Sequence, residues 1–319
     1  MDIELKEKVR NFIELNNEFK KNLRWDGKEL NSLASLIANG SYEGVNEARV
    51  KKIRKYIRKN TKFNSKFRGE FNKVFSILMN ARKDYEEVFL NTKYINQSLI
   101  ERGFKDNKQA LYTAFLLSKK FKGDELEEKL NKLFEIKEVI NQNQYDFFMK
   151  EDYIVYVYLT DIDKEIYEIA DDIKKIDSKI KSINLKEVNS LDCFYLSLLI
   201  TNSDIDKKIE KTLNIRCNLI DNYKFIEGDV YPLIGLASSF IRDDEVFSRE
   251  VCNIYNMLRE KNNFNNKGMS EKSIFKISLC IVLMRYLEYI KGDIIDLGEE
   301  EVDDIVYIIE EYIAFSFIL

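Results

Sequence analysis

Short apolar segments recur along the chain at intervals of 38 to 43 residues, from LASLI near the start to ISLCIV near the end. Their small central residues are Ser35, Ser76, Ala114, Val155, Ser197, Gly235 and Ser278. Near-continuous apolarity over so short a length predicts a helix that is buried on most sides. The small central residue is expected to let a neighbouring backbone approach closely. We interpret each segment as the first helix of a two-helix unit.

Five aspartates follow the same spacing, each just before a longer amphipathic run such as DYEEVFLNTKYINQSLI. They are Asp84, Asp124, Asp163, Asp204 and Asp244. An aspartate at this place accepts hydrogen bonds from the free N–H groups of the first helical turn, and its charge suits the helix N-terminus. Gly44 occupies the equivalent place in the first unit. The series therefore predicts where each longer helix begins.

A third series lies just past each longer helix, among polar residues. Its members are Phe63, Phe104, Tyr145, Leu185, Phe225 and Phe264. We expect these side chains to fold back onto the apolar face of the helix and to fix the turn. A stripe of ligand-binding aromatic residues is the alternative interpretation.

Three series with one period are typical of helical-hairpin solenoids. We predict an all-α fold, an α/α superhelix of about seven helical hairpins with a period near 40 residues. An N-terminal helix within residues 1–25 precedes repeated hairpins over 29–291, and a C-terminal helix spans 299–319. No Pro- or Gly-rich linker interrupts the series, so residues 1–319 are expected to form one continuous domain. The lone proline, Pro232, falls in the first turn of a short helix, where a missing N–H costs little.

Three stretches of the chain carry a family resemblance. They are NLRWDGKELNSLASLIA (Asn22 to Ala38), KFRGEF (Lys66 to Phe71) and SLIERGFKDNKQALYTAFLLS (Ser98 to Ser118). With the order of the segments, they make nearly the whole chain resemble the bacterial domain-of-unknown-function family DUF4003. The resemblance implies a helical protein of low-GC Gram-positive bacteria. The family brings no activity, cofactor or catalytic residue that would be transferred to this chain.

Composition narrows the class of protein without indicating a reaction. A hydrophobic content of 45% with a net charge of −4 excludes a disordered chain, and 11 Gly with one Pro argue against a loop-rich β fold. The chain has no His, the commonest general base and metal ligand near neutral pH. No signal-like start or long apolar run is present, so we expect a cytoplasmic protein with no membrane association. The four cysteines show no CxxC spacing and are expected to be buried, reduced thiols: Cys193, Cys217, Cys252 and Cys280.

The segment from Arg49 to Arg68 contains ten basic residues and no acidic one. Val50, Ile53 and Ile57 fall at helical spacing and should face the core. The expected anion-binding positions are Lys51, Lys52, Lys55, Arg58, Lys59 and Lys62. Four of them, at i, i+4, i+7 and i+11, would share an exposed ridge that could hold the phosphates of a nucleic acid or another polyanion. The alternative is a solvated helix face whose charge favours the helix C-terminus.

Two further residues in this part of the chain allow two interpretations each. Trp25, the single tryptophan, is either a surface aromatic for binding or a packing contact between the first helix and the first hairpin. Arg68 precedes Gly69 and Glu70 at the opening of a helix. It is either half of an exposed ion pair with Glu70 or an arginine that recognises a ligand.

The opposite end of the chain is acidic and then apolar. Ten acidic residues lie between Glu288 and Glu311 against one lysine, which suits helix capping better than a metal site, so no metal is predicted. The last eight residues, YIAFSFIL, carry no charge. Solenoid ends normally need a polar outer face. We therefore expect a monomer or a homodimer formed through the C-terminal helix, with Phe315 and Phe317 as partner contacts.

These patterns predict a non-enzymatic helical-repeat protein that acts in binding or as a scaffold. Its concave surface would engage a peptide, a protein segment or a small polar ligand. The alternative is a nucleic-acid or polyanion binder that uses the basic helix over residues 49–68. A third hypothesis is a helical enzyme whose catalysis relies on carboxylate side chains. No catalytic residue and no cofactor is predicted.

Overall fold

In the computed structural model, the described residues are 3–24, 26–40, 45–142, 153–162, 164–182, 191–199, 204–220, 230–261, 264, 269–292 and 311. Within these ranges the regular structure consists of fourteen α-helices, and no β-strand occurs among them. The all-α prediction is confirmed. The helices group into two compact units, each of which is described by itself.

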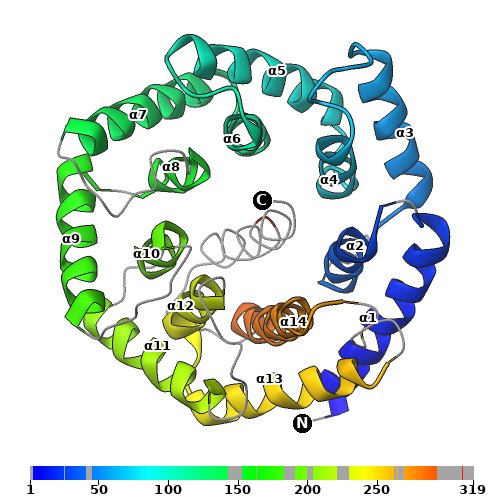
Figure 1. The fold of residues 1–319 in the computed structure, drawn as a ribbon, viewed down its shortest axis with the longest axis vertical. Helices are drawn as coiled ribbons and strands as arrows, with labels where there is room; N and C mark the ends of the chain where they lie inside the picture. Colours follow the sequence, from blue (N-terminus) through cyan, green and yellow to red (C-terminus); the bar gives the residue numbers. More distant parts are fainter. Residues whose placement is uncertain are drawn as a thin grey trace. The chain divides into compact units, whose positions relative to one another are not determined.

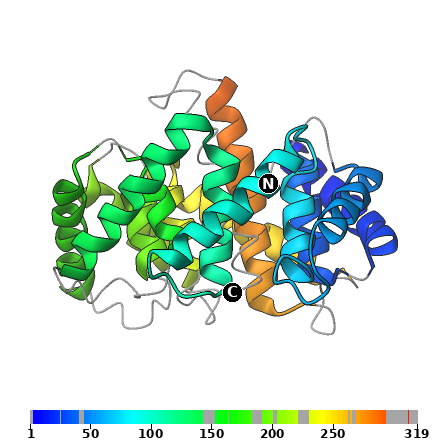
Figure 2. The same cartoon turned by 90° about the horizontal axis from the view of Figure 1, so that it is seen from above.

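Unit 1 comprises Met1–Lys83, Glu210–Ile226 and Leu236–Leu319. Its complete helices are α1 (Ile3–Asn22), α2 (Lys28–Gly40), α3 (Glu47–Lys59), α4 (Glu70–Leu78), α13 (Asp244–Arg259) and α14 (Glu271–Gly292). The pairs α1–α2, α3–α4 and α13–α14 pack together, and α2 also contacts both α14 and α4 (Figure 1). With 22 residues, α14 is the longest of the described helices (Figure 2). The apolar faces of α2, α4 and α14 thus build the core of this unit.

Unit 2 comprises Asp84–Ile209 and Glu227–Gly235. Its complete helices are α5 (Tyr85–Glu101), α6 (Lys108–Lys120), α7 (Gly123–Gln142), α8 (Tyr153–Leu159), α9 (Ile166–Ser182) and α10 (Leu191–Leu199). The short helices α6, α8 and α10 contact one another in succession and form one layer, and α7 and α9 pack side by side in a second layer. Two helices contribute to both units, α11 (Ile205–Ile220) and α12 (Tyr231–Phe240). The expectation of one continuous domain over residues 1–319 stays a prediction.

The seven short apolar segments all form helices, the even-numbered ones from α2 to α14. Their central residues Ser35, Ser76, Ala114, Val155, Ser197 and Ser278 are buried. In unit 2 a Cβ atom on Gly235 would lie 2.1 Å from Ser197 Oγ, so α12 and α10 approach as closely as the small residues suggested. The pairing differs from the interpretation in one respect. The helices α2, α4, α6 and α14 each pack most closely on the helix that precedes them, so in these four pairs the apolar segment forms the second helix.

The predictions are confirmed for the N-terminal helix, for the place of Pro232 and for one of the capping aspartates. The N-terminal helix is α1, and Pro232 is the second residue of α12. Asp204 caps α11, because its Oδ1 accepts two hydrogen bonds from first-turn amides at 2.8 and 3.2 Å. For α13 the capping prediction is wrong by one residue. The Oδ1 of Asp243 accepts the N–H of Val246 at 2.9 Å, and Asp244 is the first residue of the helix.

Two other aspartates of the series lie at helix starts without capping them. Asp84 is the N-cap residue of α5, but its side chain accepts no capping hydrogen bond. Its carboxylate forms an ion pair with Lys122 Nζ at 2.6 Å instead. Asp124 lies inside the first turn of α7, where its charge still suits the helix dipole. Asp163 and Gly44 lie outside the described residues.

The third series has a divided outcome. Phe104 and Phe264 are buried as predicted, and the Phe264 ring lies 5.7 Å from that of Phe12. For Phe63 the prediction is wrong, because its side chain is 90% exposed. Phe67 is the buried residue at this turn and packs edge-on against Phe71 at 5.6 Å. Tyr145, Leu185 and Phe225 lie outside the described residues.

The remaining predictions about single residues concern the cysteines and the C-terminus. Cys280 is buried as expected, whereas Cys217 is exposed and Cys252 is partly exposed, so for these two the prediction of a buried thiol is wrong. The Cys193 side chain, Trp25, Phe315, Phe317 and the C-terminal helix over residues 299–319 are outside what the structure describes, apart from the buried Glu311. Among the described helices, none has the length and apolarity that crossing a membrane requires.

Candidate functional site

The helix α3 is fixed at both ends and along one face. The side chain of Asn46 accepts the N–H of Arg49 at 3.0 Å, and the N–H of Asn60 donates to the last-turn carbonyls at 3.1 and 3.2 Å. Val50, Ile53 and Ile57 are fully buried, and α3 packs against α4. The opposite face of α3 therefore points to solvent, as the hydrophobic pattern predicted.

That outward face carries five of the six predicted cations, and the sixth, Lys62, lies in the loop that follows. We call them the α3 basic surface: Lys51, Lys52, Lys55, Arg58, Lys59 and Lys62. All six are exposed, and their side chains form no hydrogen bond or ion pair with any residue that the structure describes. The ridge at i, i+4, i+7 and i+11 is shorter than predicted. Since Asn60 caps the helix after Lys59, the fourth member, Lys62, extends from the loop that follows.

Three arginines of the same basic segment have a structural role instead. Arg54 forms hydrogen bonds to both carboxylate oxygens of Asp26, at 2.9 and 2.5 Å, and its Nε donates to Ser76 Oγ at 2.8 Å. Arg49 donates to the backbone carbonyl of Arg82 at 2.6 Å. Arg68, the third, binds the loop after α3. The segment thus separates inward arginines, which bind protein groups, from outward cations, which face water.

The loop after α3 is held by Arg68. Its Nε donates to Thr61 Oγ1 at 3.1 Å, and its Nη2 donates to the backbone carbonyls of Thr61, at 2.6 Å, and of Arg58. Arg68 is therefore not the exposed partner of Glu70 that one interpretation of the sequence suggested. The loop ends at Gly69, whose φ of 68° is a left-handed conformation that favours glycine.

Phe63 lies in this loop and is the functional candidate that the sequence analysis missed. It is 90% exposed, and the Arg68 guanidinium carbon lies 5.8 Å from the centroid of its ring. The periodic series placed Phe63 in the core because a buried aromatic is needed near this turn. The sequence KFNSKF contains a second phenylalanine, Phe67, which indicated that a residue other than Phe63 could occupy the buried position at this turn.

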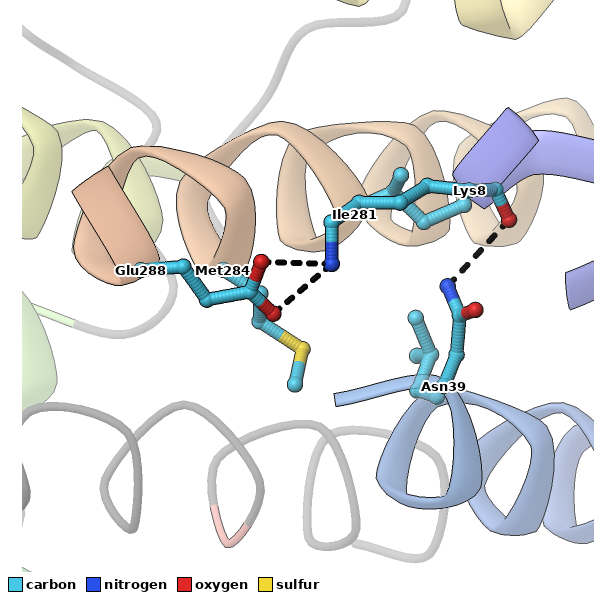
Figure 3. A pocket seen from close by; sticks show the side chains of 6 residues that line it. Lys8, Asn39, Ile281, Met284 and Glu288 are labelled. Carbon is cyan, nitrogen blue, oxygen red and sulfur yellow. Dashed lines mark hydrogen bonds and ion pairs between the residues drawn. The ribbon is translucent and has the colours of Figure 1, made fainter. Parts of the chain in front are cut away.

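A small pocket lies between α1, α2 and α14 in unit 1 (Figure 3). Lys8 and Glu288 form an ion pair across it at 2.6 Å, and Asn39 donates to the Lys8 carbonyl at 3.3 Å. Leu36, Ile281 and Met284 complete the lining. The two charges neutralise each other, and the volume is about 200 Å³ including the open mouth. The pocket therefore offers less to a charged ligand than the α3 basic surface does.

Buried ionisable groups join α13 to α14. Arg285 Nη1 lies 3.4 Å from both carboxylate oxygens of Glu250. Burial raises the pKa of Glu250, and burial together with the neighbouring Glu250 raises the pKa of Tyr286 to about 12. Arg285, Glu250 and Tyr286 thus interact with one another within this helix pair. Within the described ranges, no cluster of three or more His, Cys, Asp or Glu side chains is arranged to hold a metal ion.

Comparison with known proteins gives one match. A family model described as a protein of unknown function, DUF4003, matches residues 16–311 and so includes the whole α3 basic surface. No curated protein and no solved structure matches the chain.

Proposed function

The chain belongs to the DUF4003 family, and we propose that it is a helical-repeat binding protein whose α3 basic surface holds the phosphates of a nucleic acid. The repeat part of the proposal is an α/α superhelix of hairpins with a period near 40 residues. It is supported by the packing of consecutive long and short helices inside each unit. The binding part rests on the cations of α3.

The proposal rests on six neighbouring, exposed cations for which the described residues supply no ion-pair partner. A helix that needs only to be soluble mixes both charges, as α9 does. On α9, Lys174, Lys175 and Lys181 each form an ion pair with an aspartate three or four residues away. On α3, the one acidic residue is Glu47, in the first turn. The uncompensated charge creates a local positive potential on a chain whose net charge is −4.

Phosphates suit this surface because flexible lysine side chains can pair with successive phosphates along a nucleic-acid backbone. Such pairing does not require a shaped pocket in the protein. Each neutralised phosphate releases counterions, so the affinity falls steeply as salt is added. A groove for an apolar peptide would bind almost independently of salt. The dependence on salt therefore separates the proposed function from the peptide scaffold that the repeat pattern alone favours.

The experiment compares two triple variants in binding to a labelled oligonucleotide, measured by fluorescence anisotropy at several salt concentrations. One variant is Lys51→Ala/Lys55→Ala/Arg58→Ala, which removes the ridge. The control, Lys174→Ala/Lys175→Ala/Lys181→Ala, removes three exposed cations from α9. We expect the first to bind at least about tenfold more weakly, with a salt slope reduced by about 2. The control should behave as the wild type. Equal loss in both variants, or an affinity insensitive to salt, would contradict the proposal.

A further inference from the structure

We infer that the α3 basic surface binds single-stranded nucleic acid, and that Phe63 stacks against one of its bases. This inference rests on the proposed function and specifies the partner. Its observation is separate from the cations: an aromatic ring, 90% exposed, follows directly after Lys62. Of the large hydrophobic side chains that are exposed in the described parts of the chain, Phe63 is the most exposed.

The loop that carries the Phe63 ring is anchored before any ligand arrives. Arg68 anchors the loop through its hydrogen bonds to Thr61 and to the Arg58 carbonyl, and the same guanidinium lies 5.8 Å from the Phe63 ring centroid. Phe67 anchors the loop from the other side, in the core. A ring on an anchored loop loses little conformational freedom when a base stacks on it, which favours binding.

Core packing does not account for Phe63. The apolar face of α3 is already covered, since Val50, Ile53 and Ile57 are fully buried without it. Phe67 fills the place that the repeat pattern assigns to an aromatic residue. An exposed phenylalanine at this position therefore adds nothing to the core, and its exposed ring is available to a partner.

A cationic surface beside an exposed aromatic ring matches the chemistry of a single strand. The cations follow the phosphates, and the bases of a single strand are free to stack on an aromatic side chain. The bases of a duplex are already stacked on one another, and a polyanion such as heparin has no bases. Both would use the cations alone. Phe63 is thus the residue that distinguishes a single strand from the other polyanions.

The test measures the binding of the full chain to oligothymidine, to a duplex of the same length and to heparin. Phe63→Ala should weaken oligothymidine binding by about 5- to 100-fold and leave the salt slope unchanged, because stacking releases no counterions. Binding to the duplex and to heparin should stay within about twofold. Phe63→Trp should bind oligothymidine at least as tightly as the wild type. The control Tyr167→Ala removes an aromatic residue that is 67% exposed on α9 and should have no effect.

The outcomes separate this inference from the proposed function. If the ridge variant loses binding while Phe63→Ala binds oligothymidine as the wild type does, the inference is overturned and the proposed function stands. If Phe63→Ala weakens heparin binding equally, or if the duplex binds more tightly than the single strand, the inference is also overturned. If no nucleic acid binds at low salt, both are wrong.

Discussion

Arg54 and Asp26 form a forked ion pair in unit 1, with Nη1 2.9 Å from Oδ1 and Nη2 2.5 Å from Oδ2. The Asp26 side chain is only 2% exposed, and Lys73 Nζ lies 3.9 Å from its Oδ1. The pair joins the segment before α2 to α3. Because Arg54 and the buried residues Val50 and Ile53 share the helix, the pair also helps to set which face of α3 points to solvent.

Removing either member of this pair should be strongly destabilising. Arg54→Met leaves the buried Asp26 carboxylate with a single distant lysine, and Asp26→Ala leaves a guanidinium without its anion. Breaking a buried ion pair from one side costs about 3–5 kcal/mol. We expect each substitution to lower the free energy of unfolding by about 3 kcal/mol or more in a urea titration followed by circular dichroism.

An exposed ion pair supplies the control for this comparison. Lys174 is paired with Asp171 on the surface of α9 at 3.3 Å, both side chains being exposed, and Lys174→Met should change the free energy of unfolding by less than about 1 kcal/mol. The double variant Arg54→Met/Asp26→Ala should be more stable than the sum of its single substitutions indicates. Strictly additive losses would show that the two residues act independently.

The close approach of α12 to α10 in unit 2 leads to a second prediction, on the stability of a variant at Gly235. A Cβ atom on Gly235 would lie 2.1 Å from Ser197 Oγ and 3.2 Å from the Phe194 ring. Alanine normally stabilises a helix interior by about 1 kcal/mol relative to glycine, but overpacking costs about 1–3 kcal/mol. Gly235→Ala should therefore lower the free energy of unfolding in the same urea titration.

The neighbouring serine allows this steric cause to be isolated. Ser197→Ala removes the Oγ atom that the new methyl group would meet. In that background, Gly235→Ala should cost about 1 kcal/mol less than it does in the wild type. If Gly235→Ala lowers the free energy of unfolding equally in both backgrounds, the contact with Ser197 is not the cause of the loss.

The positions of the helices could be predicted from the sequence because buried apolar segments recur at a regular spacing along the chain. The short apolar segments around Ser76, Ala114 and Ser197 are buried helices, as their near-continuous apolarity required. The outward positions of α3 followed from Val50, Ile53 and Ile57 in the same way. Hydrophobic periodicity therefore predicts both the core and the candidate surface.

The repeat period does not predict which residue caps a helix or which residue of a loop is buried, because these details depend on the local path of the chain. Asp243 and Asp244 are adjacent, and a spacing of about 40 residues does not decide which of them caps α13. Phe63 and Phe67 are four residues apart, and only the path of the loop decides which one enters the core. The helix α3 ends at its C-cap Asn60, before Lys62, and the Asn60 side-chain amide donates to the Tyr56 carbonyl at 2.9 Å. These choices are made by local hydrogen bonds, which leave no periodic trace.

Lys208 provides a prediction about pH. It is buried at the start of α11, and its Nζ donates to the carbonyl of Leu198 at 2.7 Å. Burial lowers the pKa of Lys208 from 10.5 to about 8; Lys164 lowers the pKa further, and Asp204 opposes the shift. Since the unfolded chain binds this proton more tightly, the unfolded state carries more protons between about pH 8 and pH 10.5. The contribution of Lys208 to stability therefore rises with pH across that window.

This dependence is measured against a variant that lacks the amine. We expect the stability of the wild type relative to Lys208→Met to increase by about 2 kcal/mol between pH 7 and pH 10. Lys207→Met, which removes the exposed neighbouring amine, is the control and should show no such trend. Differencing against each variant cancels the titration of the tyrosines and of Cys280. A flat difference for Lys208→Met over this range would show that the amine keeps its ordinary pKa and is solvated in the folded protein.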